Sequence, residues 1–223
     1  MGVFGGTFNP VHFGHLHIAR KIQNLFSLSQ IQFVVATEPP HKLAEDLIQF
    51  NHRYAMVSLA TATSPSFVPS MIELEPQASP FSFDTMKKLA RYARKENSVL
   101  YFIAGGDSLV EVKTWRKSEA LLNSYNFIFV RRPGLPPLSP LDSLPEKTAA
   151  RVRDFTGLKR IQLQRRLAEE DPKDSRIYIV DIGAPDISAT RIRQRISSGK
   201  SIRNMTPGPV CEYIRKLHLY GGR

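Results

Sequence analysis

The 223-residue chain has one cysteine, one tryptophan and no long apolar run. Its single cysteine, Cys211, excludes an intrachain disulfide and a cysteine-based zinc cluster, which fits a reducing compartment. Every apolar stretch falls short of the ~18 residues that a membrane-spanning helix needs. The first residues also lack the basic segment that opens a signal peptide. We therefore expect a cytoplasmic protein without a membrane partner.

Charge is unevenly distributed along the chain. Residues 1–110 contain nine Lys and Arg against eight Asp and Glu, whereas residues 111–223 contain 22 against 12 and carry almost all of the net charge of +11. A basic half predicts an anionic partner, which could be nucleic acid, nucleotide phosphates or a membrane surface. The length and the hydrophobic content of 42% predict a single globular domain over residues 1–223.

Short β-rich runs alternate with amphipathic segments over most of the chain. We expect strands at residues 2–4, 31–36, 67–74, 99–104, 126–130 and 176–182, and helices at residues 13–26, 53–62, 84–94, 117–122, 188–197 and 209–217. This alternation predicts an α/β fold, with a Rossmann-like doubly wound parallel sheet, helices on both faces and a C-terminal helical part. Pro69 places the third strand near an edge of the sheet or makes it irregular.

A proline-rich stretch at residues 132–145 interrupts this alternation. Residues 146–170 then favour a basic helix, with a candidate break at Gly157, so we expect a basic helical insertion at about 135–175. The cations of this insertion are typical of a solvated appendage or of a contact between subunits. The sequence is therefore compatible with a homo-oligomer. They also suit an anion or nucleic-acid patch, although Phe155 is the one aromatic residue there that could stack on a base.

Candidate functional residues are most closely spaced just after the first predicted strand, in the segment GGTFNPVHFGH from Gly5 to His15. Two glycines at the carboxyl end of a parallel strand let the backbone approach a ligand, and the next helix offers free N–H groups to phosphate. His12 and His15 share one face of the first turn and can donate hydrogen bonds to phosphoryl oxygens as charge develops. A turn with two surface histidines is the plainer interpretation, and a zinc site would lack a third ligand.

This segment resembles the signature of the HxGH nucleotidyltransferases, in particular the bacterial nicotinate-nucleotide adenylyltransferases. Three further segments match that family in order: PPHK at 39–42, FIAGGDSL at 102–109 with a tryptophan downstream, and ISATRIR at 187–193. The resemblance spans nearly the whole chain outside about 135–176. It implies adenylyl transfer from ATP to nicotinate mononucleotide, giving deamido-NAD and pyrophosphate, with Mg²⁺ arriving on the ATP.

The resemblance also implies the site residues. His12 and His15 would be catalytic, and no residue would hold a resident metal. ATP would contact Gly5, Gly6, Thr7, Phe8, Gly105, Asp107, Ser188 and Arg193, with Gly105 and Asp107 on the adenosine. Nicotinate mononucleotide would contact His41, Lys42, Ser82, Thr85, Trp115 and Arg116, with Trp115 stacked on the pyridine ring. From the residues alone, Ser188 suits a helix N-cap, and Arg193 has a fork of donors suited to phosphate.

Two departures from the family pattern bear on the substrate. Phe81 stands where the family commonly has tyrosine, and Arg116 follows Trp115 where an aromatic residue is frequent. Arg116 adds positive charge near a carboxylate-bearing ring, so we hypothesise a preference for the acid over the amide substrate. Nicotinamide mononucleotide and phosphopantetheine remain alternative acceptors. A basic nucleic-acid-binding module is the alternative of another class, and it leaves the HxGH and ISATRIR segments unexplained.

Overall fold

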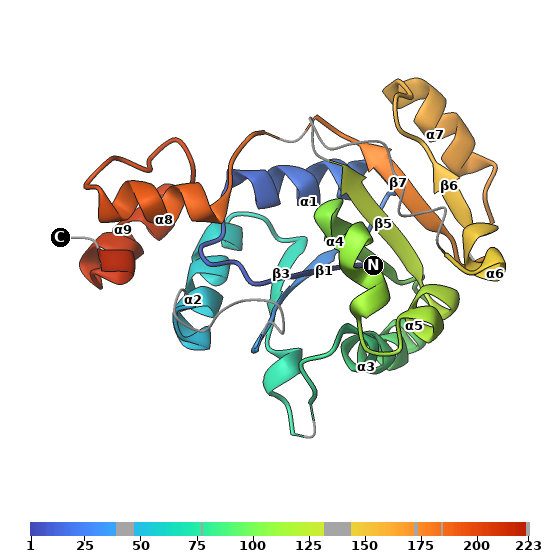
Figure 1. The fold of residues 1–223 in the computed structure, drawn as a ribbon, viewed down its shortest axis with the longest axis horizontal. Coiled ribbons are helices and arrows are strands. Elements are labelled where there is room, and N and C mark those ends of the chain that lie inside the picture. The colour runs from blue at the N-terminus through green and yellow to red at the C-terminus, as the bar shows by residue number, and fades with distance from the viewer. Residues whose placement is uncertain (39–46, 77, 132–143, 172–173, 184, 222–223) are drawn as a thin grey trace.

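The computed structural model describes residues 1–38, 47–76, 78–131, 144–171, 174–183 and 185–221 (Figure 1). At its centre the described part of the chain forms a seven-stranded sheet in the order β3-β2-β1-β4-β5-β7-β6, in which every pair of neighbours is parallel. The strands are β1 (Gly2–Gly6), β2 (Ile31–Val35), β3 (Phe67–Ser70), β4 (Tyr101–Gly105), β5 (Asn126–Arg131), β6 (Val152–Asp154) and β7 (Ile177–Asp181).

Helices cover both faces of this sheet (Figure 1). They are α1 (Phe13–Leu25), α2 (Phe50–Thr61), α3 (Ser82–Lys95), α4 (Asp107–Glu111), α5 (Ser118–Ser124), α6 (Glu146–Ala149), α7 (Arg160–Ala168), α8 (Ala189–Ser197) and α9 (Gly208–Lys216). Apolar side chains of α1, α2, α7, α8 and α9 share one buried cluster, and those of α3, α4 and α5 share the other. The predicted doubly wound α/β fold is therefore confirmed. Among the described residues, no helix has the length and apolar character needed to cross a membrane.

The strand order places a topological switch point between β1 and β4. From β1 the chain winds outward through β2 to β3, and it then returns to β4 on the other side of β1. Gly2 pairs with Ile31 of β2 and with Tyr101 of β4, so β1 is flanked on both sides. Connections leave the carboxyl ends of β1 and β4 in opposite directions, and ligands of open α/β sheets bind in the crevice that this creates.

Two predicted elements differ from the structure. The third strand ends at Ser70 and gives way to a 3₁₀ helix at Ile72–Leu74, while Pro69 lies on an edge strand as expected. The prediction of one helix over 146–170 is wrong, because the strand β6 lies between α6 and α7. β6 pairs with β7, and Phe155 after it is buried, so tertiary pairing overrides the local preference for helix.

Several cations of this basic segment are internal supports. Arg151 Nη2 donates to the Tyr125 carbonyl oxygen at 3.2 Å, its Nε donates to the Ser175 carbonyl at 2.8 Å, and its Nη1 donates to the Leu122 carbonyl. Arg153 makes an ion pair with Glu170, which is shared with Arg176. These contacts tie β6 to the end of α5 and the start of β7, so part of the charge excess stabilises the fold.

We predict that Arg151→Ala lowers the free energy of unfolding by about 2 kcal/mol, since three main-chain oxygens lose charged donors. Urea denaturation measures this change. Arg165→Ala is the matched control, because Arg165 is exposed on α7 and such surface substitutions change stability by less than about 0.5 kcal/mol. Equal stability of the two variants would contradict a supporting role for Arg151.

Candidate active site

Close packing explains the two glycines at the end of β1. A Cβ atom at Gly5 would lie 3.1 Å from Phe102 Cζ, and one at Gly6 would lie 2.9 Å from Phe8 Cζ. Phe8 itself is 2% exposed with φ at 48°, and its ring meets the His15 ring edge-on with centroids 5.0 Å apart. The structure therefore places Phe8 in the core behind a catalytic candidate, while the two glycines line a cavity.

The two motif histidines form a stacked pair at the start of α1. His12 is the N-cap and is 3% exposed, and its ring lies 3.7 Å from that of His15 between centroids at an interplanar angle of 28°. The His12 N–H donates to His15 Nδ1 at 3.2 Å. In a neutral His15 ring the proton is therefore on Nε2, and this nitrogen is a donor on the side away from the backbone.

The His12 ring leaves no room for a side chain at Gly14, which lies between the two histidines. A Cβ atom at Gly14 would lie 2.9 Å from both Cε1 and Nδ1 of His12. Because real Cβ atoms do not approach so closely, any larger residue would displace the ring. The same Cβ would lie 3.5 Å from the Ile187 carbonyl oxygen, which shows how near the residue before the α8 N-cap comes to α1.

The N-terminus of α8 meets the turn after β1. Ser188 is its N-cap, and the Ser188 hydroxyl accepts the Arg191 N–H at 3.2 Å, as its motif position predicts. Arg193 Nη1 donates to the Asn9 carbonyl oxygen at 3.1 Å. Two helix N-termini therefore lie close together, a favourable place for phosphate groups.

Arg53 is a functional candidate that sequence reasoning missed. It is 1% exposed, and its guanidinium donates to the carbonyl oxygens of Thr7 at 3.0 Å, Ala36 at 2.6 Å, Thr37 at 3.1 Å and Ile48 at 3.0 Å. It thus joins the turn after β1 to both sides of segment 39–46. The predicted His41 and Lys42 belong to that segment and lie outside the described residues. The sequence signal for this role was an arginine among the apolar residues on the buried face of α2.

The C-terminal part of the chain supports the same turn. Tyr220 donates its hydroxyl to Asn9 Oδ1 at 2.8 Å, and Thr206 donates its hydroxyl to the Val11 carbonyl oxygen at 2.8 Å. Burial raises the pKa of the Tyr220 phenol, so its proton is retained for this bond. None of these contacts was predicted, because the partners are separated by 211 and 195 positions respectively.

A cavity of about 400 Å³ opens at the carboxyl ends of the strands. It brings together six predicted residues that are distant in sequence: Gly5, Gly6, Ser82, Thr85, Trp115 and Arg116. The Trp115 ring is half-buried and meets Phe102 edge-on with centroids 5.9 Å apart. An aromatic side chain beside polar groups suits a planar heterocycle with charged substituents.

Hydrogen bonds, an ion pair and a cation–π contact position the polar groups at this cavity. Glu73, which was not predicted, accepts the Thr85 hydroxyl at 3.1 Å and the Thr37 N–H at 3.0 Å. Burial raises the pKa of Glu73 despite these bonds. Arg116 lies 3.3 Å from an Asp84 carboxylate oxygen, and its guanidinium carbon lies 4.8 Å from the Phe81 ring centroid. Phe81 therefore packs against the cation through its aromatic face.

The other predicted residues lie at the end of β4. Gly105 is the last residue of that strand, and a Cβ there would meet no heavy atom within 4 Å. Asp107 begins α4, but its side chain is outside what the structure describes. Across the described residues, no group of three or more His, Cys, Asp and Glu is placed to hold a metal ion.

The glycine-lined turn, the stacked histidines and the two helix N-termini at a switch point define a nucleotide-binding α/β protein. Residues 3–195 match the cytidylyltransferase-like family model. Probable nicotinate-nucleotide adenylyltransferases from Thermoanaerobacter sp. and Geobacter metallireducens are 33% and 36% identical, over 99% and 98% of this chain and 93% and 97% of theirs.

A solved structure has the same fold: Plasmodium falciparum nicotinic acid mononucleotide adenylyltransferase complexed with NaAD, at a TM-score of 0.70 and 19% identity, over 100% of this chain and 97% of that one. The chain belongs to the cytidylyltransferase-like family and, within it, to the nicotinate-nucleotide adenylyltransferases.

We predict that Arg53→Met lowers the free energy of unfolding by about 3 kcal/mol, because four main-chain oxygens lose their donor. Amide hydrogen exchange should accelerate most in the Thr7–His12 turn. Arg20→Met, which removes an exposed arginine from α1, is the control and should leave both quantities near wild type. Unchanged exchange in the turn would contradict its dependence on Arg53.

Proposed function

We propose that this protein transfers the adenylyl group of ATP to nicotinate mononucleotide. A phosphate oxygen of the mononucleotide attacks the α-phosphorus of ATP, the bond to the β-phosphate oxygen breaks, and deamido-NAD and pyrophosphate form. The observation that carries this proposal is the stacked His12–His15 pair at the β1/β4 switch point, beside the N-terminus of α8. Family membership and the names of the relatives support the choice of substrates.

Charge neutralisation and positioning carry this reaction. The attacking phosphate is already an anion near neutral pH, so no general base is needed. His15 Nε2, fixed as a donor by the bond at Nδ1, stabilises charge on the transferring phosphoryl group. His12 holds the same phosphates, and Ser188 and Arg193 hold the β- and γ-phosphates at the start of α8. Mg²⁺ enters as part of the ATP substrate, bound to phosphate oxygens and water.

The cavity beside the turn would take nicotinate mononucleotide. Trp115 would stack on the pyridine ring, Ser82 would offer its main-chain N–H to the carboxylate, and Thr85 would position Glu73 at the wall. The family resemblance supports the remaining assignments, which place Gly105 and Asp107 on the adenosine and His41 and Lys42 on the mononucleotide. The single cysteine is compatible with a cytoplasmic location for this step.

The test is pyrophosphate release from MgATP with a panel of nicotinate mononucleotide, nicotinamide mononucleotide and phosphopantetheine. We expect the highest kcat/KM with nicotinate mononucleotide. In His15→Ala, kcat should fall about 100-fold or more, because a donor to the developing charge is lost.

His17→Ala is the matched control for this substitution. His17 is on the same helix but lines a different cavity, so its loss should leave kcat near that of the wild type. Pyrophosphate release with none of the acceptors, or a fully active His15→Ala enzyme, would refute the proposed function or the role of His15.

Arg116 provides a separate test of substrate choice. We expect Arg116→Ala to lower kcat/KM for nicotinate mononucleotide about fivefold, the size of an exposed ion pair, and to leave that for the nicotinamide analogue unchanged. Lys117→Ala, which removes the neighbouring exposed cation, is the control. Equal losses with both substrates would show that Arg116 does not discriminate the acid from the amide.

A further inference from the structure

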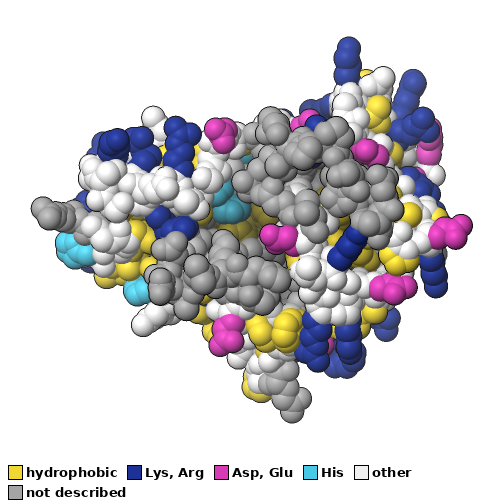
Figure 2. Space-filling model, in the orientation of Figure 1, with side chains coloured by type: hydrophobic (Ala, Val, Ile, Leu, Met, Phe, Trp, Pro, Cys, Tyr) yellow, Lys and Arg dark blue, Asp and Glu magenta, His cyan; other side chains and the backbone are white. Residues whose placement is uncertain are grey.

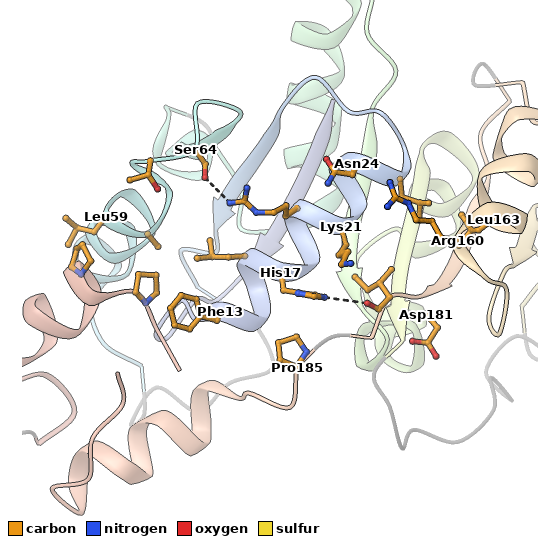
Figure 3. Close-up of a pocket in the computed structure, with 18 of the residues that line it drawn as sticks. Phe13, His17, Lys21, Asn24, Leu59, Ser64, Arg160, Leu163, Asp181 and Pro185 are labelled. Atoms are coloured by element: carbon orange, nitrogen blue, oxygen red, sulfur yellow. Dashed lines mark hydrogen bonds between the residues drawn. The ribbon is translucent and has the colours of Figure 1, made fainter. Parts of the chain in front are cut away.

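A second and larger cavity lies on the outer face of α1 (Figure 3). Its volume is about 810 Å³, and its walls come from α1, the end of α2, the start of α7, the segment after β7 and the start of α9. It shares no lining residue with the cavity between β1 and β4. Small-molecule sites in proteins usually occupy about 300–1,000 Å³, so a single organic ligand would fit.

Apolar side chains form the floor of this cavity. They are Leu16 and Leu25 of α1, Ala60 of α2, Leu163 of α7 and Ile182 after β7. Ala60 and Leu163 belong to the buried core, whereas the leucines of α1 are half-buried at its border. An apolar body placed here would be removed from water, which favours its binding.

Cations outnumber acids in the lining of this cavity. Arg20, Lys21 and Arg160 line it, against the single carboxylate of Asp181, and His17 adds a further polar ring. Arg20 donates to the Ser64 hydroxyl at 3.4 Å, and His17 Nε2 lies 3.5 Å from the Ile182 carbonyl oxygen. Lys21 and Arg160 are exposed, and within the described part of the chain their side chains make no hydrogen bond or ion pair. Figure 3 shows both on the same side of the cavity, from two different helices.

We propose that this cavity binds a small organic anion with an apolar body, such as an aromatic carboxylate or sulfonate. The apolar part would lie on the part of this floor that α1 and α7 form, and the anionic group would pair with Lys21 and Arg160. A neutral apolar molecule would leave both cations unpaired, and an inorganic anion would leave the floor exposed. The charge of the rim and the size of the floor therefore select a ligand that has both parts.

Two fluorescent probes that differ by one charged group test this proposal. Anilinonaphthalene sulfonate carries a sulfonate, and N-phenylnaphthylamine has the same aromatic body without it. Titrations are made with saturating MgATP present, so that the nucleotide site is filled. We expect the sulfonate to bind wild type more tightly than the neutral probe. In Lys21→Glu/Arg160→Glu, the sulfonate Kd should rise about tenfold, while the Kd of the neutral probe stays unchanged.

Arg165→Glu is the matched control, because it reverses an exposed cation on the same helix but outside the cavity. It should leave both affinities at the wild-type value. Retained binding of the neutral probe to the double variant shows that the cavity has kept its shape, and the single Arg160→Glu variant should give an intermediate loss.

An unchanged sulfonate Kd in the double variant would overturn the proposal. So would an equal loss in Arg165→Glu, or a loss of both probes in the single and double variants alike. Self-association that raises the measured mass to that of a dimer and displaces the probe would assign the cavity to a second copy of this chain, and would also overturn it.

Discussion

The turn between β1 and α1 has no regular secondary structure, so its main-chain oxygens need donors from elsewhere in the fold. Three residues supply them: Arg53 from α2 donates to Thr7, Arg193 from α8 donates to Asn9, and Thr206 before α9 donates to Val11. Tyr220 then holds the Asn9 side chain. Both histidines of the HxGH segment depend on this arrangement, because the turn determines where α1 begins.

The long-range hydrogen bonds to this turn could not be predicted from the sequence. The β-rich runs, the HxGH segment and the Ser188 cap were predictable, because each depends on neighbours within a few positions. The strand β6 was not, since its pairing with β7 outweighs a helix-forming composition. Arg53 was also missed, because its four acceptors lie on three separate stretches of chain that only the folded sheet brings together.

The excess of positive charge has more than one use. Arg151, Arg153 and Arg176 bind main-chain oxygens and Glu170 within the fold, which weakens the case for a nucleic-acid surface on this segment. Arg193 is turned toward Asn9 at the proposed phosphate site. In Figure 2, Lys and Arg side chains gather over the C-terminal helices and over α7, at opposite sides of the molecule. On the face that this view shows, these Lys and Arg side chains form separate groups.

The bond between Tyr220 and Asn9 joins residues 211 positions apart, which has a consequence for synthesis on the ribosome. The N-terminal strands can pair as soon as they emerge, since β1, β2 and β3 are consecutive in the chain and adjacent in the sheet. The turn between β1 and α1 gains its last hydrogen-bond donor only after Tyr220 has been added. A nascent chain interrupted just before that point can thus hold a complete sheet while the turn after β1 still lacks the donor to the Asn9 side chain.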